Sequence, residues 1–398
     1  ARSGVRVGVL SAGVSLWWVA MLLIQGRYGA DVLPYSEALR DVALTSTGPE
    51  VWRGRGYWLF YVRDPFTAAT SESLRYLTSS PSIVISFAVP IVAVAGLALT
   101  AWVHRRFAAL LVAVGLVLAV GVHPIDDRSP LMRLLTGSDE SGLALALRSS
   151  TRALPVTTLG LALGLGALVA GVGAVLVERR AGRGGRRLHL VVAGAVGALV
   201  VANLPALWTG GLVDPHLERD QDPPDAWLAA ARRLDERGDG ARVMQIPGAE
   251  FGSFDWGHTV DQPLPGLTDK PLVTRDLLPL GSPAAMDLVF ALDDRFQDGT
   301  FEPESLAPVA RMLGADTIWV AADLDDERFG TASPEAVGEL VAASPGVGAA
   351  TSFGDPVAVV LHDVAAPGSV VRAGATTVVV SGSGDGLVDL AAAGLLAG

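Results

Sequence analysis

The chain has 398 residues, of which 50% are hydrophobic, with a mean hydropathy of +0.43 and a formal net charge of −11. That apolar content exceeds the content of an ordinary soluble domain and favours a membrane protein. Cysteine is absent, which excludes disulfides, thiolate catalysis and cysteine-ligated metals. Residues 1–207 carry a balance of +8 and residues 208–398 a balance of −19. The acidic half argues against nucleic acid as a partner, because phosphate contacts need clustered cations.

Apolar runs dominate the first half of the chain. A membrane-spanning helix needs about 20 predominantly apolar residues. The sequence therefore predicts an all-α membrane bundle of five transmembrane helices, at residues 5–24, 82–103, 107–122, 153–177 and 188–207. Only His104, Arg105 and Arg106 separate the second span from the short third one, which indicates a helical hairpin. A re-entrant third segment is the alternative, and it would reverse the side of every later loop.

Arginine placement predicts the orientation of this bundle, because basic residues in short loops stay on the cytoplasmic side. Arg2 and Arg6 precede the first span, Arg105 and Arg106 form the hairpin turn, and loop 178–187 carries five arginines against one glutamate. A single orientation puts all three stretches inside. Loops 25–81 and 123–152 then lie outside, together with the acidic region 208–398.

The fourth span is rich in glycine. Small residues spaced four apart let helices approach closely, so this span is expected to lie within the bundle. The glycines are Gly160, Gly164, Gly166, Gly171 and Gly173.

Loop 25–81 is long for a connector and contains the segment VWRGRGYWLFYVRDPF (51–66). Its arginines and aromatics support two interpretations. The guanidinium groups bind a lipid phosphate while aromatic faces stack on a sugar or polyprenyl chain, or the segment is an ordinary interfacial belt with snorkelling arginines. The residues concerned are Arg53, Arg55 and Arg63, with Trp52, Tyr57, Trp58, Phe60, Tyr61 and Phe66.

Carboxylates in the two outer loops are weaker candidates. They suit a general base or a divalent-cation site, or simply a solvated turn. The group consists of Asp31, Glu37, Asp41 and Asp64 in the first loop, and of Asp126 and Asp127 beside His123 and Arg128 in the second. Arg148 and Arg152 are four residues apart and would share one face of a helix. That pair suits an anion site at the mouth of the bundle or interfacial anchoring.

Beyond a predicted hinge at 209–224, helix–strand alternation indicates an α/β domain. The clearest units are 223–246 and 304–321, and the alternation continues through 333–344, 357–363 and 376–396. The turn SGSGDG (381–386) lacks the spacing of a dinucleotide loop, because Leu387 stands where the third glycine belongs. HExxH, GxSxG and P-loop patterns are absent from the sequence, so the residues alone predict no reaction.

Several longer stretches resemble the α-(1→3)-arabinofuranosyltransferases (type D) of actinobacterial cell-wall synthesis, which are GT-C membrane glycosyltransferases. The resemblance covers essentially the whole chain. It is carried by GRGYWLFYVRDPF, HPIDDRSPL, ALRSSTRALP, VANLPALWTGGLVDP, GHTVDQPLPGLTDKPLVTRDLLPLGSP and DGLVDLAAAGLL.

The resemblance implies transfer of arabinofuranose from decaprenyl-phosphoryl-arabinose to the arabinan of arabinogalactan and lipoarabinomannan, by an inverting single displacement at the plasma membrane. It implies no evident cofactor, and leaves a divalent cation open for the full-length enzyme. The chain is expected to be an internal piece, inactive alone, with the catalytic acid upstream of Ala1 and a carbohydrate-binding region beyond Gly398. Donor-binding candidates are then Arg53, Arg55, Arg63, Tyr57, Trp58, Arg148 and Arg152.

Two alternatives stay open. One is another polyprenyl-phosphate-dependent glycosyltransferase, such as a mannosyltransferase. The other is a non-catalytic glycan-binding or export scaffold. A transporter is disfavoured, because the predicted spans lack acidic and basic residues except at their boundaries.

Overall fold

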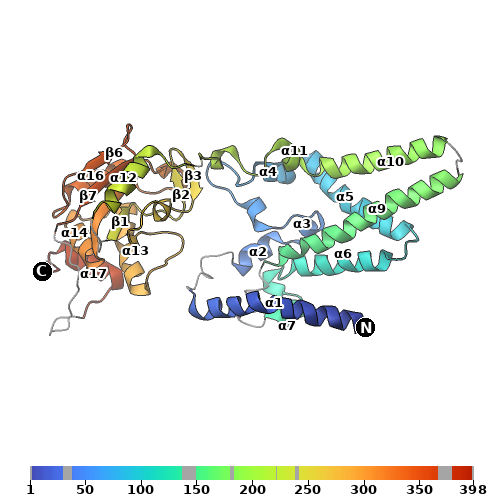
Figure 1. Ribbon diagram of the computed structural model, residues 1–398, viewed down its shortest axis with the longest axis horizontal. Helices are drawn as coiled ribbons and strands as arrows, with labels where there is room; N and C mark the ends of the chain where they lie inside the picture. The colour runs from blue at the N-terminus through green and yellow to red at the C-terminus, as the bar shows by residue number, and fades with distance from the viewer. Residues whose placement is uncertain are drawn as a thin grey trace. The chain divides into compact units, whose positions relative to one another are not determined.

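The computed structural model describes residues 2–29, 38–136, 149–179, 183–220, 222–237, 242–365 and 379–396 (Figure 1). The chain divides into two compact units, Ala1–Ala38 and Leu39–Gly398. The first unit consists mainly of one long apolar helix, α1 (Arg2–Tyr28). Arg148 and the candidate acids Asp31 and Glu37 lie outside the described residues.

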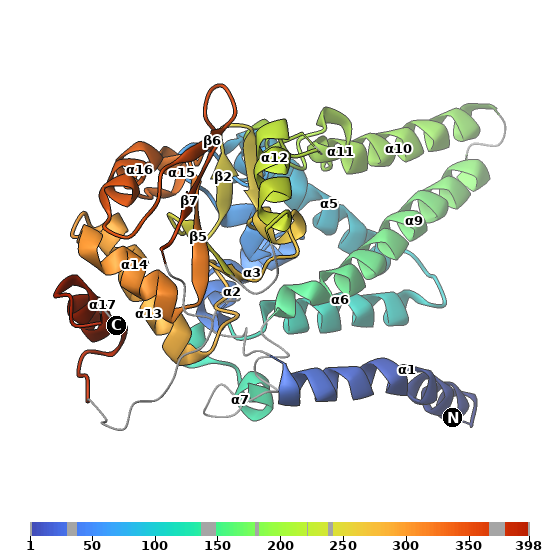
Figure 2. The ribbon, with the colours of Figure 1, turned by 60° about the vertical axis from the view of Figure 1, so that its left-hand side comes forward.

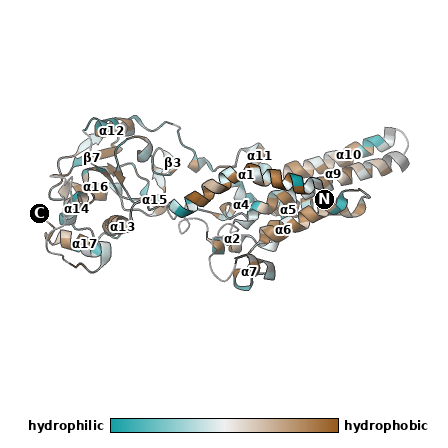
Figure 3. Cartoon of the chain, turned by 60° about the horizontal axis from the view of Figure 1, so that its bottom comes forward, coloured by the Kyte–Doolittle hydropathy of each residue, from teal (hydrophilic) through white to brown (hydrophobic). Residues whose placement is uncertain are grey.

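The chain is a multi-pass membrane protein. Within the described residues, four helical stretches are long and apolar enough to span a bilayer: Ser3–Tyr28, Ser80–Leu99, Ser150–Val175 and Gly184–Ala202. In Figure 3, which colours the ribbon by residue hydropathy, brown hydrophobic stretches recur along α1 and α5. The four helical stretches correspond to α1, α5 (Ser80–Leu99), α9 (Leu154–Arg179, preceded by the 3-10 turn η4, Ser150–Ala153) and α10 (Arg183–Ala202).

The predicted third span is present as a helix but is not confirmed as a membrane crossing. Helix α6 (Arg105–Val120) has 16 residues. At a rise of about 1.5 Å per residue it is roughly 24 Å long, short of the ~30 Å hydrocarbon core. Length and composition therefore support four of the five predicted spans. The fifth, α6, is an apolar helix that is shorter than a typical span.

Glycines bring α9 into backbone contact with its neighbours. A Cβ at Gly164 would lie 2.4 Å from the carbonyl oxygen of Ala93 on α5, and one at Gly160 would lie 2.7 Å from that of Ala108 on α6. Such approaches leave no room for any side chain. The expectation that this span packs within the bundle is confirmed for this face, whereas a Cβ at Gly166 would meet nothing within 4 Å.

Gly164→Ala is accordingly expected to destabilise the protein by about 1–3 kcal/mol, because overpacked methyl groups force helices apart. Gly166→Ala is the matched control, since open space surrounds that position. Thermal unfolding in detergent would show a lower midpoint for Gly164→Ala alone. Equal midpoints for the two variants would argue against close packing of α5 and α9.

The two loop regions that flank α5 and α6 pack on one another. Leu39, Ala43, Val122 and Met132 form a small buried cluster, and the Ser46 hydroxyl donates to the carbonyl of Val120 at 3.1 Å. The loop regions are therefore ordered structure rather than plain connectors. Their elements are α2 (Leu39–Thr45), α3 (Gly48–Trp52), η2 (Trp58–Tyr61), α4 (Ser71–Thr78), η3 (Ile125–Asp127) and α7 (Pro130–Thr136).

A five-stranded mixed sheet organises the C-terminal half, in the order β4-β1-β5-β7-β6. The strands β4, β1 and β5 run parallel, while β7 is antiparallel to β5 and β6 to β7. This arrangement confirms the predicted α/β class. The bounds are β1 (Arg242–Ile246), β4 (Leu272–Val273), β5 (Ala315–Ala321), β6 (Thr351–Phe353) and β7 (Val359–Asp363).

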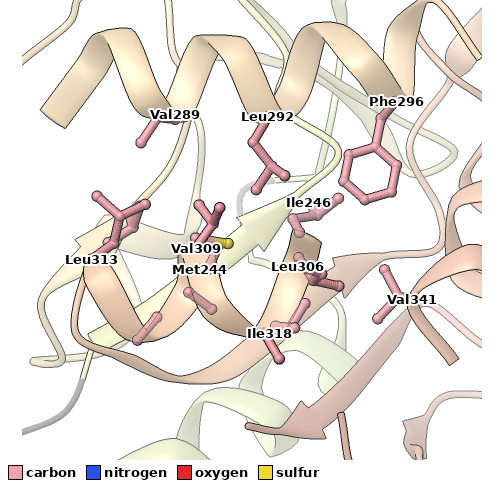
Figure 4. Close-up of a cluster of buried hydrophobic side chains, with 14 of the residues drawn as sticks. Met244, Ile246, Val289, Leu292, Phe296, Leu306, Val309, Leu313, Ile318 and Val341 are labelled. Carbon is pink, nitrogen blue, oxygen red and sulfur yellow. The ribbon is translucent and has the colours of Figure 1, made fainter. Parts of the chain in front are cut away.

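Both faces of the central strands are buried, which explains their continuous apolar sequence. Ile318 of β5 joins the core beneath one helical layer (Figure 4), and Val320 belongs to the same core. Trp319 joins a second core on the opposite face, with Trp227 and Phe254. Figure 2 shows the helices on both sides of the sheet. The first layer contains α13 (Pro283–Gln297), α14 (Pro303–Met312), α16 (Pro334–Ala343) and α17 (Ser383–Ala392), and the second contains α12 (Asp225–Asp235).

The predicted units 223–246, 304–321, 333–344 and 357–363 are confirmed by α12–β1, α14–β5, α16 and β7. In 376–396 the helix α17 is present, while most of the predicted strand lies outside the described residues. The structure adds elements that the sequence analysis missed. They are the hairpin β2 (Gly252–Phe254) and β3 (Gly257–Val260), together with β4, β6 and α13. Short helices α11 (Pro205–Thr209), η5 (Pro215–Leu217), η6 (Leu264–Gly266) and α15 (Asp326–Phe329) lie in the connections.

Candidate functional site

Arg53 is locked into the protein by internal partners. Its side chain is 5% exposed and pairs with Glu50 at 2.7 Å. Its Nε donates to the Ser86 hydroxyl at 2.8 Å and its Nη2 to the Tyr76 carbonyl at 2.5 Å. The guanidinium also lies over the ring of Phe87. These contacts join α3, α4 and α5, so Arg53 shapes the loop and has no nitrogen without a bond inside the protein.

Arg55 has a different environment. Its Cζ lies 3.5 Å from the centroid of the Tyr76 ring and 5.4 Å from that of Phe60. Its Nη2 donates to the Asn203 carbonyl at 3.5 Å, but its Nε is buried and unpaired among the described residues. Burial, reinforced by the nearby positive charge of Arg53, lowers the pKa of Arg55.

No carboxylate among the described residues forms an ion pair with Arg55. A cation that is withdrawn from water in part and lacks a counter-ion loses hydration without compensation. The arrangement is suited to an anion that supplies the missing negative charge.

Two further buried polar atoms belong to residues near Arg55: Trp58 follows it in the same loop, and the Asn203 carbonyl accepts a hydrogen bond from it. Trp58 Nε1 and Asn203 Oδ1 are buried without a hydrogen-bond partner in the described structure. Tyr57 and Trp58 have ring centroids 5.7 Å apart at an interplanar angle of 50°. Buried unpaired polar groups are rare and require an explanation such as a ligand. We define Arg55, Tyr57, Trp58, Tyr76 and Asn203 as the Arg55 site.

The other predicted arginines are placed apart from these contacts. Arg63 is exposed and pairs through its backbone with Ala68 in an isolated β-bridge. Arg152 is exposed in η4. Within the described part of the chain, neither Arg63 nor Arg152 shares a hydrogen-bond, ion-pair or ring partner with Arg55. The proposed pairing of Arg152 with Arg148 lies outside the described residues.

Most described carboxylates of the loops have structural partners. Asp64 accepts from the backbone N–H groups of Phe66 and Thr67, and Asp127 forms an exposed ion pair with Arg133. Glu50 accepts from the Tyr61 hydroxyl at 2.6 Å. Burial and this hydrogen bond raise the pKa of Tyr61, so its phenol stays protonated. For Asp127, the solvated-turn interpretation fits the geometry best.

The predicted hinge 209–224 is anchored at its start. Asp214 is buried and accepts from the hydroxyls of Ser71 at 2.7 Å and Thr67 at 2.8 Å. Burial alone would favour the neutral acid, but these bonds and those from His216 outweigh it and lower the pKa of Asp214. The carboxylate therefore stays ionised and fastens the connection to the loop.

A second attachment joins the loop to the α/β domain. Arg328 in α15 is 6% exposed, and its Nη1 donates to Asp64 at 2.6 Å. The two residues are 264 positions apart in the sequence. Neither partner carries a sequence signal of pairing, because an isolated aspartate and an isolated arginine are common on any surface.

The fold and the site define a multi-pass membrane protein with a basic, aromatic surface loop and an attached α/β domain. The family model described as α-(1→3)-arabinofuranosyltransferase, N-terminal GT-C domain, matches residues 6–396. The chain belongs to that family of GT-C glycosyltransferases.

Two curated relatives carry the name α-(1→3)-arabinofuranosyltransferase. The protein of Mycolicibacterium smegmatis is 30% identical over 349 residues, which cover 86% of this chain and 24% of the relative. The protein of Mycobacterium tuberculosis is 29% identical over 356 residues, covering 86% of this chain and 25% of the relative. The chain thus spans about a quarter of the length of these relatives.

Solved structures show the same fold. The cryo-EM structure of arabinofuranosyltransferase AftD from Mycobacteria superposes with a TM-score of 0.57 at 24% identity, covering 88% of this chain and 23% of that one. A mutant of that protein gives a TM-score of 0.50 over 79% of this chain and 24% of its own.

Proposed function

We propose that this chain forms part of a membrane arabinofuranosyltransferase. The enzyme transfers arabinofuranose from decaprenyl-phosphoryl-arabinose to the arabinan of arabinogalactan or lipoarabinomannan, with inversion in a single displacement. Family membership supports the reaction class. The observation that carries the role of this chain is Arg55, a partly buried cation whose Nε is buried without a hydrogen-bond partner and which has no paired carboxylate among the described residues.

The chemistry of the donor fits the Arg55 site. When the bond from the sugar to the phosphate oxygen breaks, negative charge develops on the departing polyprenyl phosphate. A fixed cation in a water-poor site stabilises that charge most strongly. Arg55 supplies the cation and Tyr57 and Trp58 the aromatic surface. Arg63, Arg148 and Arg152 are proposed to attract the phosphate from outside, and Arg53 to hold the loop in shape.

We also propose the topology of the chain. The membrane region occupies 1–207, with α6 as the shorter fifth span, and an extracytoplasmic domain occupies 208–398. The arginine-rich stretches at the N-terminus, at Arg105 and Arg106, and in 178–187 support this orientation. In a plasma membrane, the Arg55 site and the α/β domain then share the outer compartment.

The absence of cysteine makes this topology directly testable. Single cysteines at Glu218 and Gly184, both exposed positions, are introduced separately into the chain. A membrane-impermeant maleimide applied to intact cells is expected to label Glu218→Cys and spare Gly184→Cys. Lysed cells should label both. The reverse pattern in intact cells would overturn the proposed orientation and the placement of the reaction outside.

The sugar is tested with the purified full-length protein that contains this chain. It is incubated with labelled polyprenyl-phosphoryl arabinose or polyprenyl-phosphoryl mannose and an arabinan acceptor. Transfer of arabinose alone is expected. Transfer of mannose would support the alternative glycosyltransferase, and transfer of neither sugar would support a non-catalytic glycan-binding role.

A further inference from the structure

A polar cleft of about 380 Å³ opens in the α/β domain, apart from the Arg55 site. Three segments that are distant in the sequence form its walls. They are the connection after η5, the β2–β3 hairpin and the start of α15. The side chains that matter here are those of Glu218, Asp255, Trp256, His258, Asp325 and Arg328.

The charges of the cleft disfavour an anion. Glu218, Asp255 and Asp325 contribute three carboxylates. The single guanidinium, Arg328, is already bonded to Asp64 at 2.6 Å. Partial loss of solvent around the carboxyl, with the negative charges of Asp325 and Asp326, raises the pKa of Asp255. A phosphate-bearing donor would meet repulsion here, so this cleft and the Arg55 site differ in the ligands that they suit.

A metal ion is also a poor match. Among the described residues, no group of three or more histidine, aspartate or glutamate side chains has the arrangement of a metal site. The cleft is therefore lined mainly by side chains that accept or donate hydrogen bonds. Uncharged hydroxyl groups are the ligands that satisfy such a set without adding charge.

An aromatic ring lines the same cleft. Trp256 stacks on Phe254 with centroids 5.5 Å apart and an interplanar angle of 9°, and it packs against Trp227 at 6.1 Å. These neighbours hold the half-buried indole in place. A sugar ring has an apolar C–H face and a rim of hydroxyls, which is the combination that an aromatic wall and carboxylates bind together.

Close backbone contact fixes the walls of the cleft. Gly257 adopts a φ of +142°, and a Cβ there would lie 2.4 Å from the Cβ of Arg219. The hairpin therefore lies directly on the connection that carries Glu218. Ser253 additionally donates to Asp325 at 3.2 Å. The cleft is preformed, which lowers the entropy cost of binding.

We propose that this cleft binds an uncharged furanose oligosaccharide, with Trp256 stacking on a sugar ring and Asp255 and Asp325 accepting hydrogen bonds from its hydroxyls. The inference rests on the proposed function for two points, namely that the sugar is a furanose and that the oligosaccharide is the acceptor. Arg328 connects the cleft to Asp64, nine positions beyond Arg55 in the same loop. The acceptor chain is thereby held on the side of the α/β domain that contacts the donor-binding loop.

Binding is measured by calorimetry with the full-length protein in lipid nanodiscs and a linear arabinofuranose hexasaccharide. Trp256→Ala and Asp255→Asn are each expected to weaken binding at least tenfold, and Trp256→Phe to restore most of the affinity. Asp298→Asn, an exposed acid at the end of α13, serves as the control. Asp255 is exposed, so Asp255→Asn tests the cleft even if Trp256→Ala misfolds.

Transfer kinetics separate this inference from the proposed function. Each variant is expected to raise the KM for the acceptor by about the same factor as it weakens hexasaccharide binding. The KM for the donor should stay unchanged in all three variants, Trp256→Phe, Trp256→Ala and Asp255→Asn. Hexasaccharide binding that depends on Trp256, without arabinose transfer, would support the cleft and contradict the enzyme. Arabinose transfer with an unchanged acceptor KM in both Trp256→Ala and Asp255→Asn would overturn the cleft alone. Failure of the unmodified protein to bind the hexasaccharide would also overturn it.

Discussion

Arg55→Gln is expected to reduce arabinose transfer by about 10²–10³-fold in kcat, the range typical of removing one charge-stabilising group from an active site. The Arg55 Cζ lies over the Tyr76 ring, 3.5 Å from its centroid, and the guanidinium lacks a carboxylate partner among the described residues. Its positive charge is therefore available to the phosphate that leaves the sugar. The measurement is single-turnover transfer from polyprenyl-phosphoryl arabinose by the full-length enzyme, which separates the chemical step from product release.

The fold of the Arg55→Gln protein should be preserved. Because no carboxylate among the described residues pairs with the partly buried Arg55, removing its charge relieves a desolvation cost, so the unfolding midpoint is expected to stay level or rise. Arg40→Gln is the matched control, because Arg40 lies on α2 in the same loop region and is exposed. Full transfer activity in Arg55→Gln, equal to that of Arg40→Gln, would contradict a role in donor binding and support interfacial anchoring for the arginines of this loop.

Arg53→Gln is expected to have the opposite profile and to lower the free energy of unfolding by about 3–5 kcal/mol, the usual cost of breaking a buried ion pair. The change leaves the partly buried Glu50 without its cation. It also removes charge-assisted bonds to the Ser86 hydroxyl and the Tyr76 carbonyl. The check is denaturant unfolding of the purified protein, with tryptophan fluorescence as the signal.

Arg53→Lys distinguishes charge from geometry at this position. Lysine keeps the positive charge but cannot reach three acceptors with a planar fork. We expect it to recover part of the lost stability. If Arg53→Gln unfolded at the same denaturant concentration as the unmodified protein, the internal contacts of Arg53 would contribute little, and Arg53 would rejoin the candidates for donor binding.

Arg55→Gln and Arg53→Gln are expected to differ in stability and activity, although Arg53 and Arg55 look alike in the sequence. Arg53 and Arg55 occupy the same aromatic segment and are separated by one glycine. Gly54 adopts a positive φ of 73° and Gly56 one of 92°. The left-handed conformation at Gly54 turns the chain between the two arginines, and that at Gly56 turns it again directly after Arg55. One arginine then meets Glu50 and Ser86, and the other meets Tyr76 and Asn203.

The sequence by itself determined the features that depend on neighbouring residues. Long apolar runs predicted the membrane spans that the structure shows as α1, α5, α9 and α10. The alternation of helix and strand patterns predicted α12–β1 and α14–β5. Spacing of small residues also predicted the close packing of α9. These features follow from burial patterns that repeat along one element, so a single sequence contains them.

Only the tertiary structure decided which charged groups are already paired. The partners of Arg55, Asp214 and Arg328 lie far along the chain, with Asn203 148 positions from Arg55 and Asp64 264 positions from Arg328. Short hairpin strands such as β2 and β3 likewise depend on packing against Trp227, a residue outside the hairpin. An ion pair or a cleft forms from residues that the fold brings together, and their separation in sequence leaves no periodic signal.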